Sequence, residues 1–227
     1  MSRRYNCILF DLDDTLLSYS REEKNCILKV LENHELPHSD DVITLFDEIN
    51  DWHTFELGRE ITCYDVIVNH FARLLKMLEV KGEQLDSCLN EFYEGMRKSS
   101  KLNKGALKTL KYLKDNGYRI YITSNGYPDF QYPRIKKARI SKFFDGFFIS
   151  EEIGHKKPSP AFFNYVFTRI PESNRSKVLV VGDAPTADIL GGINAKFDTV
   201  WVSNGKSRCK YKSTYTIKNI DELINIL

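Results

Sequence analysis

The sequence lacks any apolar run long enough to cross a membrane. A transmembrane helix needs roughly 20 consecutive apolar residues, and no stretch of the 227-residue sequence approaches that length. Near the N-terminus, the apolar run CILF is interrupted after four residues by Asp11, so a secretory signal is not expected either. We therefore predict a cytoplasmic protein that has no membrane partner.

Cysteine is present only as scattered single residues. The five cysteines are odd in number and widely spaced along the chain: Cys7, Cys26, Cys63, Cys88 and Cys209. No CxxC pair occurs, and no histidine cluster has the spacing of zinc ligands. This pattern predicts free thiols in a reducing compartment.

The chain also lacks a strong charge of either sign. Its 33 basic and 31 acidic side chains leave a formal net charge of +2, which gives no long-range attraction to nucleic acid. Two local basic runs, residues 134–139 and 205–212, are interpreted as solvated surface. We therefore expect no nucleic-acid polymer as a partner.

What the sequence does contain is a core: 42% of its residues are hydrophobic and 12% are aromatic. Short β-branched and aromatic runs alternate with helical stretches, and a further short strand and a terminal helix follow in 215–227. The runs cover residues 5–10, 118–124, 144–150, 177–183 and 198–203. Near-continuous apolar strands between helices indicate an α/β fold with a doubly wound, Rossmann-like parallel sheet.

Residues 18–100 break this alternation. Four consecutive stretches place apolar residues at three- and four-residue spacing, which predicts four amphipathic helices packed on one another. We therefore expect a core domain of residues 1–17 and 101–227 and an inserted helical domain of residues 18–100. Three aromatic residues of the insertion are interpreted as core rather than as a platform for a ligand: Trp52, Phe55 and Tyr64.

Polar side chains follow the predicted strands at the points where the strands end. In chain order they are Asp11, Asp13, Asp14, Ser124, Asn125, Gly126, Lys156, Lys157, Asp183 and Asp188. In an open parallel sheet, ligands bind just beyond the carboxyl ends of the strands, because loops and helix N-termini converge there. We therefore expect these residues to share one crevice.

The acidic residues of this crevice require a countercharge. At an effective dielectric of about 20, two like charges about 4 Å apart repel by about 4 kcal/mol. Oxygen ligands favour a hard divalent cation, and Mg²⁺ is the usual ion where a phosphate oxygen completes the coordination. The hydroxyl of Ser124 and backbone N–H groups can then hold a phosphate, while two carboxylates divide the roles of nucleophile and acid/base.

Four short motifs carry a family resemblance. They are DLDDT (11–15), ITSNG (122–126), KKP (156–158) and GDAPTAD (182–188). In this order they resemble the motifs of the haloacid dehalogenase (HAD) superfamily, and the helical insertion is similar to its C1-type cap. Within the superfamily, residues 149–167 and 178–195 are most similar to YjjG-type pyrimidine 5′-nucleotidases.

The resemblance implies roles for the acidic residues. Asp11 would be the nucleophile that forms an aspartyl-phosphate, and Asp13 would be the acid/base. Mg²⁺ would be held by Asp11, the backbone carbonyl of Asp13, and Asp183. Asp188 would support the metal site, either directly or through a neighbour, and Thr15 is expected to fix the loop by hydrogen bonding. Asp14 is interpreted as a residue that starts a helix or a turn and faces solvent.

The resemblance also implies a phosphate site. Ser124, Asn125 and Lys157 would bind the phosphoryl group, with Lys157 bridging it to the nucleophile. Lys156 stays open as the alternative lysine, although its place in the motif favours it less.

The function that these features predict is a Mg²⁺-dependent phosphatase acting on small phosphomonoesters, first of all a nucleoside 5′-monophosphate. The cap would admit small metabolites rather than phosphoproteins, and a monomer is the default expectation.

A phosphosugar phosphatase or mutase of the same superfamily is the alternative. A haloacid dehalogenase is less favoured because it needs no metal, and a phosphoreceiver module because no long insertion follows its first strand. A non-catalytic binding protein would have little reason to keep both Asp11 and Asp13.

Overall fold

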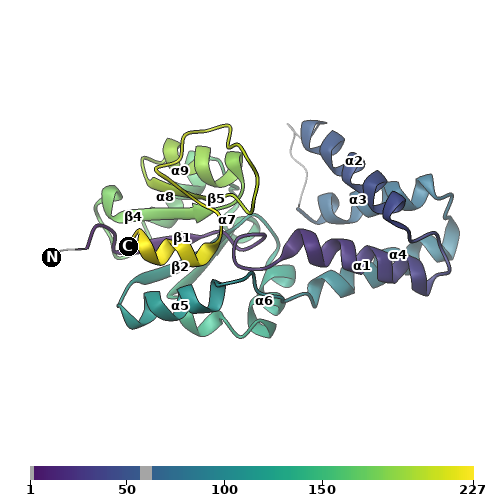
Figure 1. Ribbon diagram of the computed structural model, residues 1–227, viewed down its shortest axis with the longest axis horizontal. Coiled ribbons are helices and arrows are strands. Elements are labelled where there is room, and N and C mark those ends of the chain that lie inside the picture. Colours follow the sequence, from purple (N-terminus) through teal and green to yellow (C-terminus); the bar gives the residue numbers. More distant parts are fainter. Residues whose placement is uncertain (1–2, 57–62) are drawn as a thin grey trace. The chain divides into compact units, whose positions relative to one another are not determined.

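The computed structural model describes residues 3–56 and 63–227, of which 50–56 and 63–67 are described as backbone only. The chain forms two compact units, one of Met1–Ser18 with Ser100–Leu227 and the other of Tyr19–Ser99 (Figure 1). Among the described helices, none combines the length and the apolar character that a membrane span requires.

The larger unit is built on a six-stranded sheet with the strand order β3-β2-β1-β4-β5-β6. Every neighbouring pair of strands is parallel, with Leu9 of β1 opposite Tyr121 of β2 and Val180 of β4. The strands are β1 (Cys7–Phe10), β2 (Arg119–Ser124), β3 (Gly146–Ile149), β4 (Val178–Gly182), β5 (Asp198–Val202) and β6 (Tyr215–Ile217). The expected doubly wound α/β fold is therefore confirmed.

Helices cover both faces of this sheet (Figure 1). They are α5 (Ala106–Asp115), α6 (Pro128–Lys137), α7 (Ser150–Ile153), α8 (Pro160–Phe167) and α9 (Gly191–Asn194). Short 3₁₀ helices span Ser141–Phe143, Arg175–Lys177 and Ile220–Asn225, and a π-helix, η3, spans Pro185–Leu190. The expected terminal helix is thus a 3₁₀ helix, and a capping box between Asn219 and Glu222 fixes its first turn.

The alternation of side chains along β1 explains why a strand that is buried throughout needs two layers of helices. Ile8 and Phe10 pack in the cluster that contains residues of α5 and the C-terminal 3₁₀ helix. Cys7 and Leu9 pack in the opposite cluster, with Phe163 and other side chains of α8. Successive residues of a strand point to opposite faces, so β1 lies in the centre of the core and carries its C-terminal loop at a fixed position.

The smaller unit consists of four helices among the described residues: α1 (Tyr19–Asn33), α2 (Asp40–Glu56), α3 (Cys63–Met77) and α4 (Gly82–Arg97). Helix α4 packs against α1 and α3, and α2 packs against α3. Phe71 of α3 and Phe92 of α4 are both buried, with ring centroids 4.6 Å apart. The expected packing of amphipathic helices on one another is therefore observed here. The side chains of Trp52, Phe55 and Tyr64 lie outside the described residues.

The cysteines behave as their spacing predicts. The four whose side chains are described are free thiols: Cys7, Cys26, Cys88 and Cys209. The side chain of Cys63 lies outside the described residues.

Candidate active site

The acidic loop after β1 continues the strand by one residue before it turns. The backbone N–H of Asp11 donates to the carbonyl of Val181 at 2.9 Å, as the next rung beside β4. Asp11 is buried, and Leu12 is completely buried beside it in the core. Asp14 has a φ of 54°, a left-handed conformation that Asp tolerates in turns. The sheet therefore holds Asp11 rigidly, while Asp14 makes the turn.

The loop after β4 is joined to the loop after β1. The backbone N–H of Asp183 donates to Thr15 Oγ1 at 3.1 Å, which is the loop-fixing contact expected of Thr15. The carbonyl of Asp183 accepts a hydrogen bond of 2.9 Å from Trp201 Nε1, a contact that the sequence pattern did not reveal. Both Thr15 and Asp183 are buried, so water does not compete for these bonds.

Three carboxylates from the two loops and from η3 meet in one buried cluster. Carboxylate oxygens of Asp11, Asp183 and Asp188 lie within 4.8 Å of one another. Oxygen-only donors at this separation suit a hard divalent ion such as Mg²⁺. The residues present therefore fit the metal that the sequence predicts.

Two carboxyl groups of the cluster have raised pKa values. Burial, opposed by Lys157 but reinforced by Asp188 and Asp183, raises the pKa of Asp11 well above its usual range. Burial and the charge of Asp188 raise the pKa of Asp183 to about 7, against a smaller opposing effect of Lys206. The lysines of the site thus do not offset the effects that disfavour the charged carboxylates, and a bound cation would favour their charged forms.

Lys157 is the buried cation of this site. Its Nζ donates to Asp11 Oδ1 at 2.7 Å, to Asp188 Oδ1 at 2.6 Å and to the carbonyl of Thr123 at 2.8 Å. Burial alone would lower its pKa, but the charges of Asp11 and Asp188 outweigh burial and raise it. Lys156 is exposed, so the geometry favours Lys157 of the two candidate lysines.

Asp188 uses both of its carboxylate oxygens within the protein. Oδ1 accepts from Lys157, and Oδ2 accepts from the backbone N–H of Ala184 at 3.1 Å. Gly182 leaves room for this arrangement, because a Cβ on Gly182 would lie 2.1 Å from Asp188 Oδ2. Asp188 therefore anchors Lys157 and the loop after β4.

The predicted phosphate-binding residues lie at the end of β2 and just beyond it. Ser124 is buried, and its Oγ accepts from Gln131 Nε2 at 3.0 Å. The side-chain amide of Asn125 is engaged by the backbone of Lys157, with bonds of 2.9 Å to its carbonyl and 2.8 Å from its N–H. The Asn125 side chain thus holds the loop of Lys157 in place.

The interpretation of residues 134–139 as solvated surface is wrong for Arg134. This residue lies on α6 and is completely buried, and its Nη1 is 2.7 Å from Asp13 Oδ1. Gln131, one helical turn earlier, donates to Asp13 Oδ2 at 2.8 Å. The sequence could have indicated these two residues through their three-residue spacing after the ITSNG motif, because residues three apart share one helix face.

The second basic run, 205–212, also contributes a residue to the site. Lys206 Nζ lies 3.2 Å from Asp183 Oδ2, although 57% of the Lys206 side chain stays exposed. Its interpretation as solvated surface is therefore correct for most of the side chain but misses the contact of the amine.

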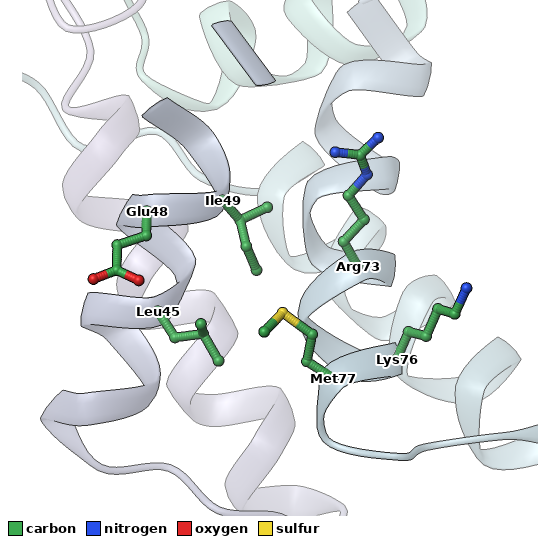
Figure 2. A pocket seen from close by; sticks show the side chains of 6 residues that line it. All are labelled: Leu45, Glu48, Ile49, Arg73, Lys76 and Met77. Carbon is green, nitrogen blue, oxygen red and sulfur yellow. The ribbon is translucent and has the colours of Figure 1, made fainter. Parts of the chain in front are cut away.

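A separate hollow lies within the smaller unit, between α2 and α3. Its volume is about 350 Å³, and six residues line it: Leu45, Glu48, Ile49, Arg73, Lys76 and Met77 (Figure 2). None of these residues belongs to the predicted chemistry, and the lining contains no group of carboxylates comparable to the cluster around Lys157. The candidate site is therefore the cluster at the end of the sheet.

Comparisons with known proteins identify the family to which this chain belongs. The family model for haloacid dehalogenase-like hydrolases matches residues 5–196. The HAD-hydrolase YfnB of Bacillus subtilis is 33% identical over 99% of this chain and 96% of its own. The crystal structure of YfnB, described as bound to magnesium and as revealing interdomain movement, covers 99% of both chains with a TM-score of 0.87 and 32% identity.

Two further relatives carry names of phosphate-ester hydrolases. The pyrimidine 5′-nucleotidase YjjG of Escherichia coli is 27% identical over 99% of this chain and 98% of its own. The glyceraldehyde 3-phosphate phosphatase of Pyrococcus furiosus is 31% identical over 99% of this chain and 94% of its own. These similarities span both compact units, so the resemblance inferred from the four motifs is confirmed.

Proposed function

Because this chain belongs to the haloacid dehalogenase-like hydrolases, we propose that it is a Mg²⁺-dependent phosphatase that forms an aspartyl-phosphate on Asp11. The observation that carries the proposal is the placement of Asp11: one carboxylate oxygen lies 2.7 Å from the buried amine of Lys157, in a cluster with Asp183 and Asp188. A nucleophile, a cation for the phosphoryl group and a set of metal ligands thus meet at one point.

The metal would be held by Asp11, Asp183 and the backbone carbonyl of Asp13. When bound, Mg²⁺ supplies positive charge that offsets these carboxylates and the oxygens of the phosphoryl group. Asp188 supports the site by holding Lys157 and the loop after β4, because its two oxygens accept hydrogen bonds from Lys157 and from Ala184.

The residues of the chain then divide the reaction between them. Asp11 attacks phosphorus, and the bond to the leaving oxygen breaks as Asp13 gives that oxygen a proton. Lys157 and Ser124 hold the phosphoryl oxygens in line with Asp11. In the second half Asp13 takes a proton from water, which attacks the aspartyl-phosphate and releases inorganic phosphate.

The substrate we propose is a nucleoside 5′-monophosphate, and the similarity to YjjG over both units supports this choice. The similarity to the glyceraldehyde 3-phosphate phosphatase of Pyrococcus furiosus favours a sugar phosphate as the second candidate. We propose that the smaller unit acts as a cap that excludes water from the site, which limits substrates to small molecules.

A substrate panel tests this choice. We expect kcat/KM to be highest for pyrimidine nucleoside 5′-monophosphates in a set that also contains purine nucleotides, phosphosugars and phosphorylated acids. A strong response to sugar phosphates beside a flat response to pyrimidine nucleotides would replace the first candidate by the second. Each substrate is measured by phosphate release, with an enzyme-free reaction as the control.

The mutase alternative makes a different prediction. A mutase must protect its phosphorylated aspartate from water, so a sugar monophosphate with a catalytic amount of the bisphosphate would isomerise without releasing phosphate. For a phosphatase we expect phosphate release and no isomer. A dehalogenase is disfavoured because its chemistry leaves Asp13 and the Asp183 cluster without a purpose.

The two adjacent lysines give a matched pair of variants. Lys157→Met removes the buried amine that contacts Asp11, and we expect kcat/KM to fall about 10²- to 10³-fold, the usual cost of losing one group that stabilises transition-state charge. Lys156→Met changes an exposed side chain of the same type, and we expect activity close to that of the unmodified protein. Equal losses in the two variants, measured with saturating Mg²⁺, would contradict the assignment.

We also propose that the enzyme acts in the cytoplasm. The free thiols of the described cysteines support this location.

A further inference from the structure

Helix α6 presents a charged side chain to the active site from inside the protein. Arg134 is completely buried, and a buried guanidinium is costly unless it is paired. Its Nη1 lies 2.7 Å from Asp13 Oδ1 in an ion pair. The same guanidinium lies 5.1 Å from the centroid of the Phe130 ring. The carboxylate in this ion pair with Arg134 is thus that of the predicted acid/base.

Gln131 links the same carboxylate to the phosphate site. Its Nε2 donates to Asp13 Oδ2 at 2.8 Å and to Ser124 Oγ at 3.0 Å. Its Oε1 accepts from Arg134 Nη1 at 2.7 Å, which fixes the orientation of the amide. Asp13, Ser124, Gln131 and Arg134 therefore form one network that joins the loop after β1, the end of β2 and helix α6, and all of its members except Asp13 are buried.

The backbone around this network is shaped to admit the glutamine. A Cβ on Gly126 would lie 2.8 Å from Gln131 Nε2 and 3.2 Å from its Cγ. The glycine of the ITSNG motif thus leaves the space that Gln131 occupies. A side chain at position 126 would therefore clash with Gln131 in its present position.

We propose that Gln131 and Arg134 are positioning residues that hold the Asp13 carboxylate in the orientation for its two proton transfers. This inference rests on the function proposed above. Arg134 supplies a rigid, permanently charged partner to one carboxylate oxygen. Gln131 holds the other oxygen at a fixed distance from Ser124, and so ties the proton donor to the group that binds the phosphoryl oxygens. Neither residue touches the reacting atoms.

Leaving-group dependence distinguishes this role from a structural one. Phenyl phosphate and p-nitrophenyl phosphate have similar shapes, but p-nitrophenolate departs more readily without a proton. The parameter kcat/KM reports only the steps up to departure of the leaving group. A misplaced Asp13 should therefore lower kcat/KM for phenyl phosphate much more than for p-nitrophenyl phosphate.

The variants are Gln131→Met and Arg134→Met, with Lys137→Met as the control. Lys137 is an exposed cation on the same helix, and we expect its variant to match the unmodified protein. For Gln131→Met and Arg134→Met we expect kcat/KM for phenyl phosphate to fall about 10- to 100-fold, part of the full effect of general acid catalysis. The value for p-nitrophenyl phosphate should change far less.

A second readout concerns the later half of the reaction. Asp13 must also take a proton from the attacking water, so both variants should release p-nitrophenol in a burst of about one equivalent per enzyme before a slow steady state. Equal losses of kcat/KM for the two substrates without a burst would show a merely structural role and overturn the proposal.

Two controls keep this outcome interpretable. Gln131→Met leaves the Arg134–Asp13 ion pair in place, so it tests the proposal even if Arg134→Met fails to fold, and thermal unfolding reports the state of each variant. If the unmodified protein hydrolyses neither aryl phosphate, the proposed function itself fails. If the unmodified protein is active and both variants keep its ratio of the two kcat/KM values, only the positioning role fails.

Discussion

Asp11→Asn is expected to abolish phosphatase activity, with kcat lowered on the order of 10⁴-fold or more, as for the loss of other enzymatic nucleophiles. The amide has nearly the shape of the carboxylate, but it is a poor nucleophile and carries no charge for the metal or for Lys157. Phosphate release from p-nitrophenyl phosphate at saturating Mg²⁺ measures the effect.

Asp14→Asn is the matched control for this variant. Asp14 belongs to the same acidic loop, but its backbone makes the left-handed turn, a conformation that Asn also tolerates. We expect this variant to keep most of its activity. Turnover by the Asp11 variant comparable to that of the Asp14 variant would exclude Asp11 as the nucleophile.

Removal of divalent cations should have the second-largest effect. With EDTA we expect kcat to fall at least about 10²-fold, since like charges about 4 Å apart repel by about 4 kcal/mol at an effective dielectric of about 20. A phosphate monoester adds negative charge to a cluster in which burial already raises the pKa of Asp183 to about 7. We therefore expect the substrate to approach Asp11 only when a cation offsets these charges.

Addition of excess Mg²⁺ should restore the activity. Ca²⁺ is larger and accepts a less regular coordination, so we expect it to restore much less. An Asp183→Asn variant should show a raised Mg²⁺ requirement, because it loses one of the buried carboxylates. Full activity in EDTA would contradict the metal site and would reopen the dehalogenase alternative.

The sheet could be predicted from sequence because its strands are buried on both faces. CILF and VLVVG are apolar without interruption and are completely or almost completely buried, and such runs between helices have few other interpretations. The location of the site followed from topology, since Asp11 and Asp183 directly follow β1 and β4, which are neighbours in the sheet.

The supporting residues of the site could not be predicted in the same way. Arg134 lies in a run of basic residues whose composition is typical of surface, and only its place on the inner face of α6 separates it from exposed Lys136 and Lys137. Pro133 lies inside this helix, where a proline is expected to kink it or delay its start, yet α6 begins at Pro128 and continues to Lys137. The facing of a short helix depends on tertiary packing, and sequence spacing alone does not determine it.

Asp188 illustrates a different limit. It reaches Lys157 from a π-helix, Pro185–Leu190, and a π-turn changes which side chains share a face. The acidic residue itself was evident in the GDAPTAD motif. Its two hydrogen bonds, which make it an anchor for Lys157 and for Ala184, depend on a backbone geometry that has no clear sequence signature.

The most direct test of the account is to trap the covalent intermediate. The unmodified protein is mixed with p-nitrophenyl phosphate and Mg²⁺, quenched in acid within the first turnover, digested and analysed by peptide mass spectrometry. We predict a phosphoryl group on Asp11 that is absent from the Asp11→Asn variant. Phosphate release without any phosphorylated Asp11, or with the phosphoryl group on another residue, would contradict the mechanism proposed for this protein.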